Sequence, residues 1–426
     1  MKKLILLKSC FALMLAAFVV SCDSDDSDDP GRDPNLEYGW SKAMCGNDLE
    51  EIAWPDQSEN YWEYTMDVKE YPNVGLRFKG QFPTNDTRFF NLTAYNEETT
   101  KRVATIEDFN IIPNDGSKNP FTATGISGTN YFEVNVVPSN ISSAMKSSLS
   151  NVLEFPETTK KLSFLLRIYF NSADHGADFG GVELPEIVFF DINTGKEIGD
   201  AVRTKSNYYD ACKAIVASIP PLKASNGLVF TLAPDLMYSN GPTGYVTAAN
   251  RLKTGEALLF RFIPPVHPEN ISQNKEADVR YWSICVGDTL THTPYTLPDR
   301  QIVKSDDKYV NFIIIEKRDP NLEAVKAKAS AMKINVIEWD GAKFGEPMMV
   351  FYRQMYIREG FEYSVQKIPA FPPLNDLGLP DATAEIKPEN MAHISLGEHG
   401  PSGVKMPSAA ILQETFDYSF MRIPMP

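Results

Sequence analysis

The chain has 426 residues, of which 43% are hydrophobic and 23% are charged. A chain of this length is expected to form roughly two or three domains, and its composition is too apolar for a disordered protein. Asp and Glu number 56 against 41 Lys and Arg, which gives a net charge of −15. This excess of acid argues against nucleic acid as a partner, because phosphate binding needs clustered positive charge.

Residues 1–21 have the pattern of a secretory signal peptide. Early lysines are followed by a mainly apolar run over residues 4–20, and the small Ser21 closes the run next to Cys22. A small residue before cysteine at this place resembles the lipobox of bacterial lipoproteins. The resemblance implies that Cys22 carries palmitate or a similar lipid. A plain signal peptide or a single membrane span is the alternative.

Residues 22–36 are rich in Asp and Ser, and like charges this dense stay solvated and extended. This segment is predicted to be a tether. It resembles the acidic tag of lipoproteins on the outer face of the outer membrane, so we expect a lipid-anchored outer-membrane protein that faces outward. No later apolar run reaches about 18 residues, the length that spans a membrane.

The rest of the chain is predicted to be mainly β. Short apolar or alternating runs rich in Phe, Tyr, Val and Ile are bounded by turn residues, which is typical of strands. The predicted strands are 74–78, 89–95, 131–137, 162–170, 187–191, 228–232, 257–263, 281–286, 309–316, 334–339 and 347–352. Helices are predicted only at 142–151, 207–218 and 319–332. We expect tandem β-sandwich or jelly-roll-like domains with few helices.

Two segments indicate an internal duplication. Residues 76–95 and 258–287 both run from a strand through a Pro-containing turn into a second strand that begins Asp-x-Arg-aromatic-aromatic. Aromatic strands can match by composition alone, so the duplication is a hypothesis. It divides the chain into a first sandwich domain over 37–205, a linker helix over 206–218 and a second sandwich domain over 219–426.

Several segments resemble, in chain order, a family of exported two-domain bacterial proteins: 80–83, 88–90, 111–121, 165–169, 180–186, 280–283 and 351–366. The family has no assigned activity, so the resemblance implies only a fold and its extent. The family's loop before Gly180 is usually rich in Pro and Asp, whereas this chain has His175 there. No family-wide role therefore follows for His175.

Three cysteines lie beyond Cys22, namely Cys45, Cys212 and Cys285. They allow at most one disulfide, and the sequence leaves open whether any two of them pair. We expect all three to be small buried residues.

The loop over residues 171–181 is the segment with the most chemically capable side chains. Asp174, His175 and Asp178 lie within five residues on a glycine-rich backbone. Such a set could bind a divalent metal ion or act as an acid–base pair. The competing interpretation is an ordinary turn, in which Asp and Gly are the expected residues.

Three arginines and two tyrosines are the other candidate binding residues. Arg88, Arg167 and Arg280 lie beside strand aromatics, and a buried arginine must be paired. They form either a structural clamp or a socket for an anionic ligand. Tyr61 and Tyr281 could stack on a sugar or another flat ligand, and the alternative for both is a place in the core.

The sequence favours a non-catalytic envelope module that binds a glycan or another small external ligand. Tandem β-domains on a tether can display recognition loops, and only 5 His and no recognisable nucleophile motif are present. An exported enzyme that uses a metal ion or the Asp/His pair of the 174–181 loop is one alternative. A structural component of a surface assembly is another.

Overall fold

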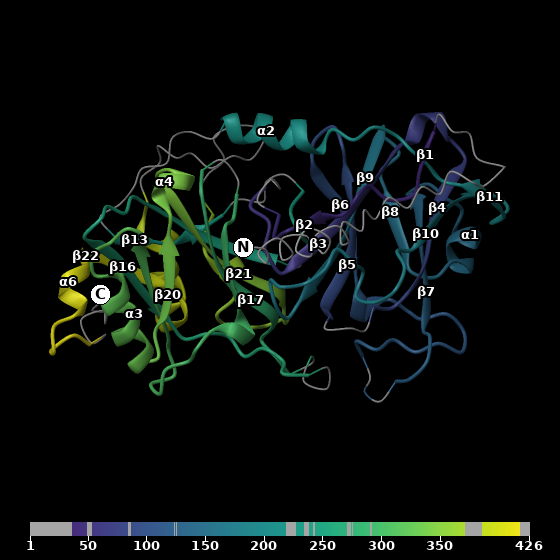
Figure 1. The fold of residues 1–426 in the computed structure, drawn as a ribbon. Helices are drawn as coiled ribbons and strands as arrows, with labels where there is room; N and C mark the ends of the chain where they lie inside the picture. Colours follow the sequence, from purple (N-terminus) through teal and green to yellow (C-terminus); the bar gives the residue numbers. More distant parts are fainter. Residues whose placement is uncertain are drawn as a thin grey trace, which may run out of the picture. The chain divides into compact units, whose positions relative to one another are not determined.

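The computed structural model describes residues 36–48, 53–83, 87–122, 124, 126–218, 227–233, 238–241, 243–270, 274, 276–289, 292–370 and 386–417. Cys22, the signal peptide and most of the acidic tether lie outside these residues. Strands dominate, and the predicted mainly β fold is confirmed (Figure 1). Among the described residues, no helix is long and apolar enough to cross a membrane.

Residues 44–200 form two five-stranded sheets, which we call sheets I and II. Sheet I has the order β11 (Glu197–Asp200), β10 (Glu186–Asp191), β4 (Val74–Gln81), β7 (Tyr131–Pro138) and β8 (Val152–Phe155). Sheet II has the order β2 (Met44–Cys45), β3 (Glu59–Asp67), β9 (Lys161–Phe170), β5 (Thr87–Asn96) and β6 (Lys101–Glu107). Together they form the first sandwich.

Residues 227–407 form sheets III and IV, which make the second sandwich. Sheet III has the order β14 (Thr231–Leu232), β15 (Thr243–Asn250), β21 (Met348–Ile357), β17 (Val279–Gly287) and β18 (Tyr295–Pro298). Sheet IV has the order β13 (Gly227–Val229), β22 (Ser402–Pro407), β16 (Glu256–Phe262), β19 (Val310–Glu316) and β20 (Asn335–Trp339).

Helices and short strands connect and cover these sheets. The α-helices are α1 (Ser143–Ser148), α2 (Tyr208–Ser218), α3 (Leu322–Ala331), α4 (Gly341–Phe344), α5 (Ala392–Ser395) and α6 (Ser408–Ile411). The 3-10 turns include η1 (Val68–Glu70), η2 (Asp108–Asn110), η4 (Asp299–Gln301), η5 (Val365–Lys367), η6 (Pro388–Asn390) and η7 (Gly397–His399). The remaining strands are β1 (Glu37–Tyr38) and β12 (Val202–Arg203). The three predicted helices correspond to α1, α2 and α3.

Each sandwich has its own aromatic core because successive strand residues point to opposite faces. In the first core, Phe78 lies between Tyr64 and Phe164, with ring centroids 6.3 and 5.3 Å away. In the second core, Phe260 stacks on Phe312 at 4.6 Å. Burying several such rings supplies most of the driving force for folding each sandwich.

The two sandwiches repeat one topology. In sheet I, β7 runs parallel to β8 with α1 between them in sequence, and in sheet IV, β19 runs parallel to β20 with α3 between them. The central strands of sheet II, β3-β9-β5, match β15-β21-β17 of sheet III. Arg88 lies on β5 and Arg280 on β17, so the two arginines occupy equivalent strands, as the duplication hypothesis requires.

Sheets II and III pack against each other through the faces that do not line the two cores. Phe89 stacks on Tyr169 at 4.5 Å within sheet II, and Tyr281 of sheet III lies 5.4 Å from Tyr169. The described residues from Tyr38 onward form one compact unit.

Candidate functional site

The predicted arginines Arg88 and Arg280 cross between the sandwiches in opposite directions. Arg88 donates from Nη1 and Nη2 to the two carboxylate oxygens of Asp299, at 2.7 and 2.9 Å. Arg280 pairs with Asp108. Each arginine also donates to the backbone carbonyl of the other. All four side chains are buried. Their pairing therefore fits a structural clamp and not a socket for an anionic ligand.

The aspartates of this clamp are held by backbone groups as well. Asp108 accepts from the Phe90 amide at 3.0 Å, and Asp299 accepts from the Trp282 amide at 3.2 Å. Asp108 lies on η2 and Asp299 on η4, the 3-10 turns that follow β6 and β18. The two halves of the clamp are thus built from equivalent residues.

The third predicted arginine, Arg167, also joins the sandwiches. It donates to the Tyr95 hydroxyl at 2.7 Å and to the Tyr238 carbonyl at 2.6 Å, and its Nε lies 3.3 Å from Glu59. Burial raises the pKa of Glu59 to about 6, although Arg167 opposes the shift.

The equivalent arginine of the second sandwich, Arg353, is not among the residues predicted from the sequence. Arg353 on β21 donates to the Trp54 carbonyl, as Arg167 on β9 donates to the Tyr238 carbonyl. Trp54 and Tyr238 have left-handed φ angles of 52° and 51°. The sequence carries a signal for Arg353, because Arg353 follows Tyr352 and thus also lies beside a strand aromatic, as the predicted arginines do.

Tyr61 and Tyr281 are buried too. Tyr281 donates its hydroxyl to Asp56, whose oxygens lie 2.9 and 3.0 Å away, and Ser283 donates to the same carboxylate at 2.6 Å. Tyr61 packs beside Tyr208, with ring centroids 6.3 Å apart. The five predicted ligand-binding residues are therefore all buried inside the protein and do not lie on its surface.

In the 171–181 loop, the side chains of His175 and Asp178 make separate local contacts, and Asp174 makes one through its backbone amide. His175 stacks on Phe170 at 4.5 Å, and its Nε2 lies 2.8 Å from the Gln57 carbonyl. Asp178 accepts from the Gly181 amide at 2.9 Å, which is a turn contact. The Asp174 amide donates to the Ser172 hydroxyl at 3.0 Å. Within the described ranges, no group of three or more His, Cys, Asp or Glu residues lies together as a metal site.

Cys45, Cys212 and Cys285 do not pair with one another as disulfides. Cys212 and Cys285 are buried, as predicted, whereas Cys45 is only half-buried. Burial raises the pKa of Cys212 to about 12 and that of Cys285 to about 11. Both thiols are therefore almost fully protonated at neutral pH and are poor nucleophiles.

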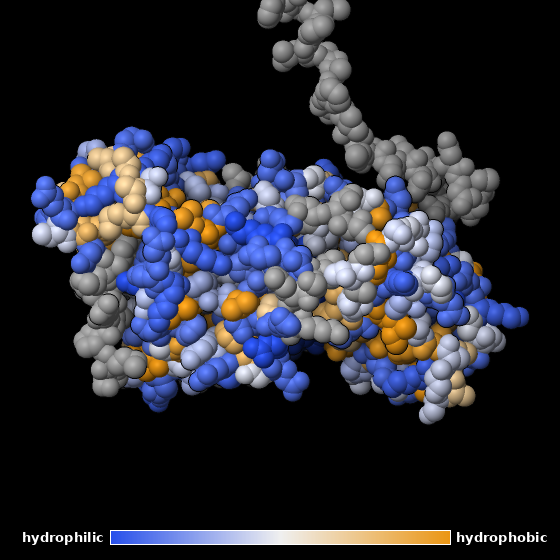
Figure 2. Space-filling view, turned by 90° about the horizontal axis from the view of Figure 1, so that it is seen from below, coloured by the Kyte–Doolittle hydropathy of each residue, from blue (hydrophilic) through white to orange (hydrophobic). Residues whose placement is uncertain are grey.

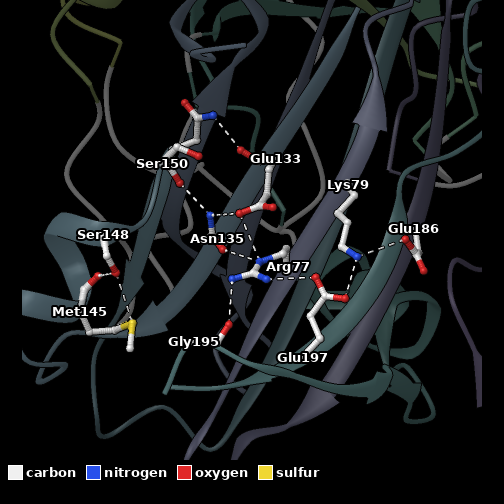
Figure 3. Close-up of polar contacts among 11 residues, drawn as sticks. Arg77, Lys79, Glu133, Asn135, Met145, Ser148, Ser150, Glu186, Gly195 and Glu197 are labelled. Carbon is white, nitrogen blue, oxygen red and sulfur yellow. Dashed lines mark hydrogen bonds and ion pairs between the residues drawn. The ribbon is translucent and has the colours of Figure 1, made fainter. Parts of the chain in front are cut away.

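A network of charged residues lies on the outer face of sheet I (Figure 3). Arg77 on β4 lies 3.2 Å from Glu133 on β7 and 3.0 Å from Glu197 on β11. Lys79 on β4 lies 2.9 Å from Glu197 and 3.5 Å from Glu186 on β10. We call Arg77, Lys79, Glu133, Glu186 and Glu197 the charged face. Leu76 and Phe78 on β4 point into the core. Because side chains alternate along a strand, Arg77 and Lys79 point to the opposite, outer face of sheet I.

Residues at the edge of the charged face are exposed to solvent, whereas Arg77 at its centre is mostly buried. Arg77 is 12% exposed and lies over the Phe190 ring at 4.7 Å. The Glu186 side chain is 58% exposed, and Tyr131, which starts β7 on the same side as Glu133, is 46% exposed. The hydrogen bond from Lys79 lowers the pKa of Glu197 below its usual value, so this carboxylate is ionised at neutral pH.

The second sandwich covers the equivalent surface. Arg77 pairs in register with Asn135, and the matching pair on sheet IV is Leu259 with Ile313. Both of these apolar residues are fully buried. Helix α3 has ten residues where α1 has six, and α3 carries buried apolar side chains into the second core. At the position of Arg77 the second sandwich thus has a buried apolar residue, whereas at the position of Lys79 it keeps a cation, Arg261, which pairs with Asp307 at 2.8 Å.

Some large apolar residues are exposed among the described residues, including Ile112, Val266 and Val303. Figure 2 shows hydrophobic residues on one face of the molecule in several separate groups among hydrophilic ones. Single exposed apolar residues are common on soluble surfaces.

No protein-family model matches the sequence, and no curated protein matches it significantly. Among solved structures, an uncharacterized protein from Burkholderia cenocepacia is similar with 9% identity and a TM-score of 0.46, over 88% of this chain and 84% of that one. The VPA0106 protein from Vibrio parahaemolyticus has 11% identity and a TM-score of 0.40, over 74% of this chain and 88% of that one. At these values the similarities carry no argument about function.

Proposed function

We propose that this protein is a lipid-anchored protein of the bacterial outer membrane whose body is a non-catalytic binding module for a glycan or another small external ligand. The lipid would be carried on Cys22 and the acidic segment 22–36 would hold the body away from the membrane. The signal-like leader and the residue pair Ser21-Cys22 support the anchor.

The observation that carries the binding proposal is the charged face of sheet I. It presents two cations and three carboxylates on four neighbouring strands, and Tyr131 lies beside them. Sugar hydroxyls both donate and accept hydrogen bonds, and hydrogen bonds to charged groups are about twice as strong as those between neutral groups. A tyrosine ring adds a flat apolar surface for the sugar ring.

The charges favour a neutral ligand over an anionic one. Three carboxylates against two cations leave the charged face with one excess negative charge, and the whole chain carries −15. A polyanion would be repelled by this field, although salt screens the effect beyond about 10 Å.

The test is a calorimetric titration of the mature chain carrying Cys22→Ala with neutral and uronic-acid-containing oligosaccharides. We expect at least one neutral oligosaccharide to bind, and both Lys79→Ala and Tyr131→Ala to weaken that binding about tenfold or more, because each removes a direct contact. Lys326→Ala is the matched control, since Lys326 on α3 makes a comparable pair with Glu338 at 2.6 Å. No heat with any oligosaccharide, or wild-type affinity in Lys79→Ala and Tyr131→Ala, would contradict the proposal.

A further inference from the structure

Two buried glutamates of sheet II hold the start of helix α2. Glu63 on β3 accepts a hydrogen bond from the Ser206 hydroxyl at 2.6 Å, and Glu97, just after β5, accepts from the Asn207 amide at 2.7 Å. Ser206 also accepts from the Tyr208 amide at 2.9 Å, a local side-chain-to-backbone contact just before the helix. Both carboxyls thus anchor the N-terminal end of the helix.

The same pair reaches the second sandwich. Glu97 accepts from the Tyr238 hydroxyl at 2.9 Å, and the Tyr238 carbonyl accepts from Arg167 at 2.6 Å and from Tyr95 at 3.0 Å. The glutamates therefore connect sheet II, α2 and the segment that leads into β15.

Charges of both signs act on Glu63 in this cluster. Glu63 and Glu97 are only 5% and 3% exposed, and their like charges oppose each other. Arg203 is the cation whose charge acts on Glu63. The other groups facing the cluster are the hydroxyls of Thr65, Ser206, Tyr208 and Tyr238 and the thiol of Cys212.

We propose that this cluster is a proton-controlled latch, in which a proton on Glu63 keeps α2 docked on sheet II and loss of that proton loosens α2 together with the Tyr238 contact. This latch is independent of the charged face of sheet I, because it shares no residue with it.

The direction of the effect follows from the protonation of Glu63 in the two states. Burial raises the pKa of Glu63 from 4.5 to about 7, with Glu97 adding to the shift and the Ser206 hydrogen bond opposing it. Between pH 4.5 and about pH 7, Glu63 is mostly protonated when α2 is docked and mostly ionised when α2 is undocked. Docking therefore weakens as the pH rises from about 5 to 8.

The experiment is hydrogen–deuterium exchange of the mature chain carrying Cys22→Ala, at pH 5.5 and pH 8.0. After correction for the intrinsic rate, we expect exchange in residues 208–218 to be on the order of tenfold faster at pH 8.0. Glu63→Gln, which cannot ionise, should remove this difference. Glu98→Gln is the matched control, because Glu98 neighbours Glu97 but is exposed, and it should keep the difference.

Equal protection of α2 in the wild-type chain at the two pH values would overturn the proposal without recourse to any variant. A pH difference that persists in a folded Glu63→Gln protein would also overturn it, since another group would then be titrating.

Discussion

Removing a buried arginine is expected to destabilise the protein more than removing an arginine or lysine at the surface. Arg88 donates two hydrogen bonds to Asp299, and both side chains have almost no contact with solvent. In contrast, Lys160 and Glu98 form a pair at 3.5 Å with about half of each side chain exposed. Removing one member of a buried pair leaves an uncompensated charge, whereas an exposed pair is largely replaced by water.

We therefore expect Arg88→Ala to lower the free energy of unfolding by about 3–5 kcal/mol, and Lys160→Ala to change it by less than about 1 kcal/mol. Urea denaturation of the two variants, monitored by tryptophan fluorescence, measures both values. An Arg88→Ala protein as stable as the wild type would show that the clamp contributes little.

The sequence predicts that each buried arginine needs a partner, but it does not identify that partner. Arg88 and Asp299 are 211 positions apart, and no local pattern links two residues that far apart. The charged face of sheet I was missed for a different reason. The predicted strand 74–78 includes Arg77 but ends before Lys79, and strand alternation does not indicate which carboxylates of other strands lie beside these cations.

At the scale of elements, short strands and helices were predictable because their periodicity is local. The side chains of β4 alternate because this strand packs on one face only. The residues of β17 are buried throughout because this strand packs on both faces. The pairing of sheets II and III was not predictable, because it depends on aromatic residues such as Phe89 and Tyr281 that look the same as core residues in the sequence.

The 171–181 loop offers a prediction at this scale. Gly180 has φ +63°, and a Cβ there would lie 2.5 Å from Thr87 Oγ1 and 2.6 Å from Pro83 Cβ. Gly116 has φ +78° and nothing within 4 Å. Both positions lie in the left-handed region, so the backbone strain of an added Cβ is similar and the difference between them measures the clash.

We expect Gly116→Ala to lower the melting temperature by a few degrees, corresponding to about 1–2 kcal/mol, and Gly180→Ala to lower it by clearly more. Differential scanning calorimetry of both variants checks this. Equal shifts would mean that the loop moves away from Thr87 and Pro83 at little cost.

At the scale of the whole molecule, the anchor is the expectation with the most direct test. Replacing Cys22 by Ala should abolish labelling with palmitate and move the protein from the membrane fraction to the soluble fraction, because a lipid chain supplies the membrane affinity. Metabolic labelling and fractionation of cells expressing the two forms measure this. A Cys22→Ala protein that is still labelled and sediments with membranes would contradict the lipid anchor.

The crossed pairs Arg88–Asp299 and Arg280–Asp108 also have a consequence during synthesis of the chain. Synthesis completes β5 and η2, with Arg88 and Asp108, long before Arg280 and Asp299 exist. The first sandwich is thus finished while its joining surface still displays an unmatched cation, an unmatched anion and the ring of Phe89. A chain stopped between residues 218 and 279 would keep this surface uncovered indefinitely. We therefore expect fragments that end within this interval to be prone to self-association, because they expose this unpaired surface.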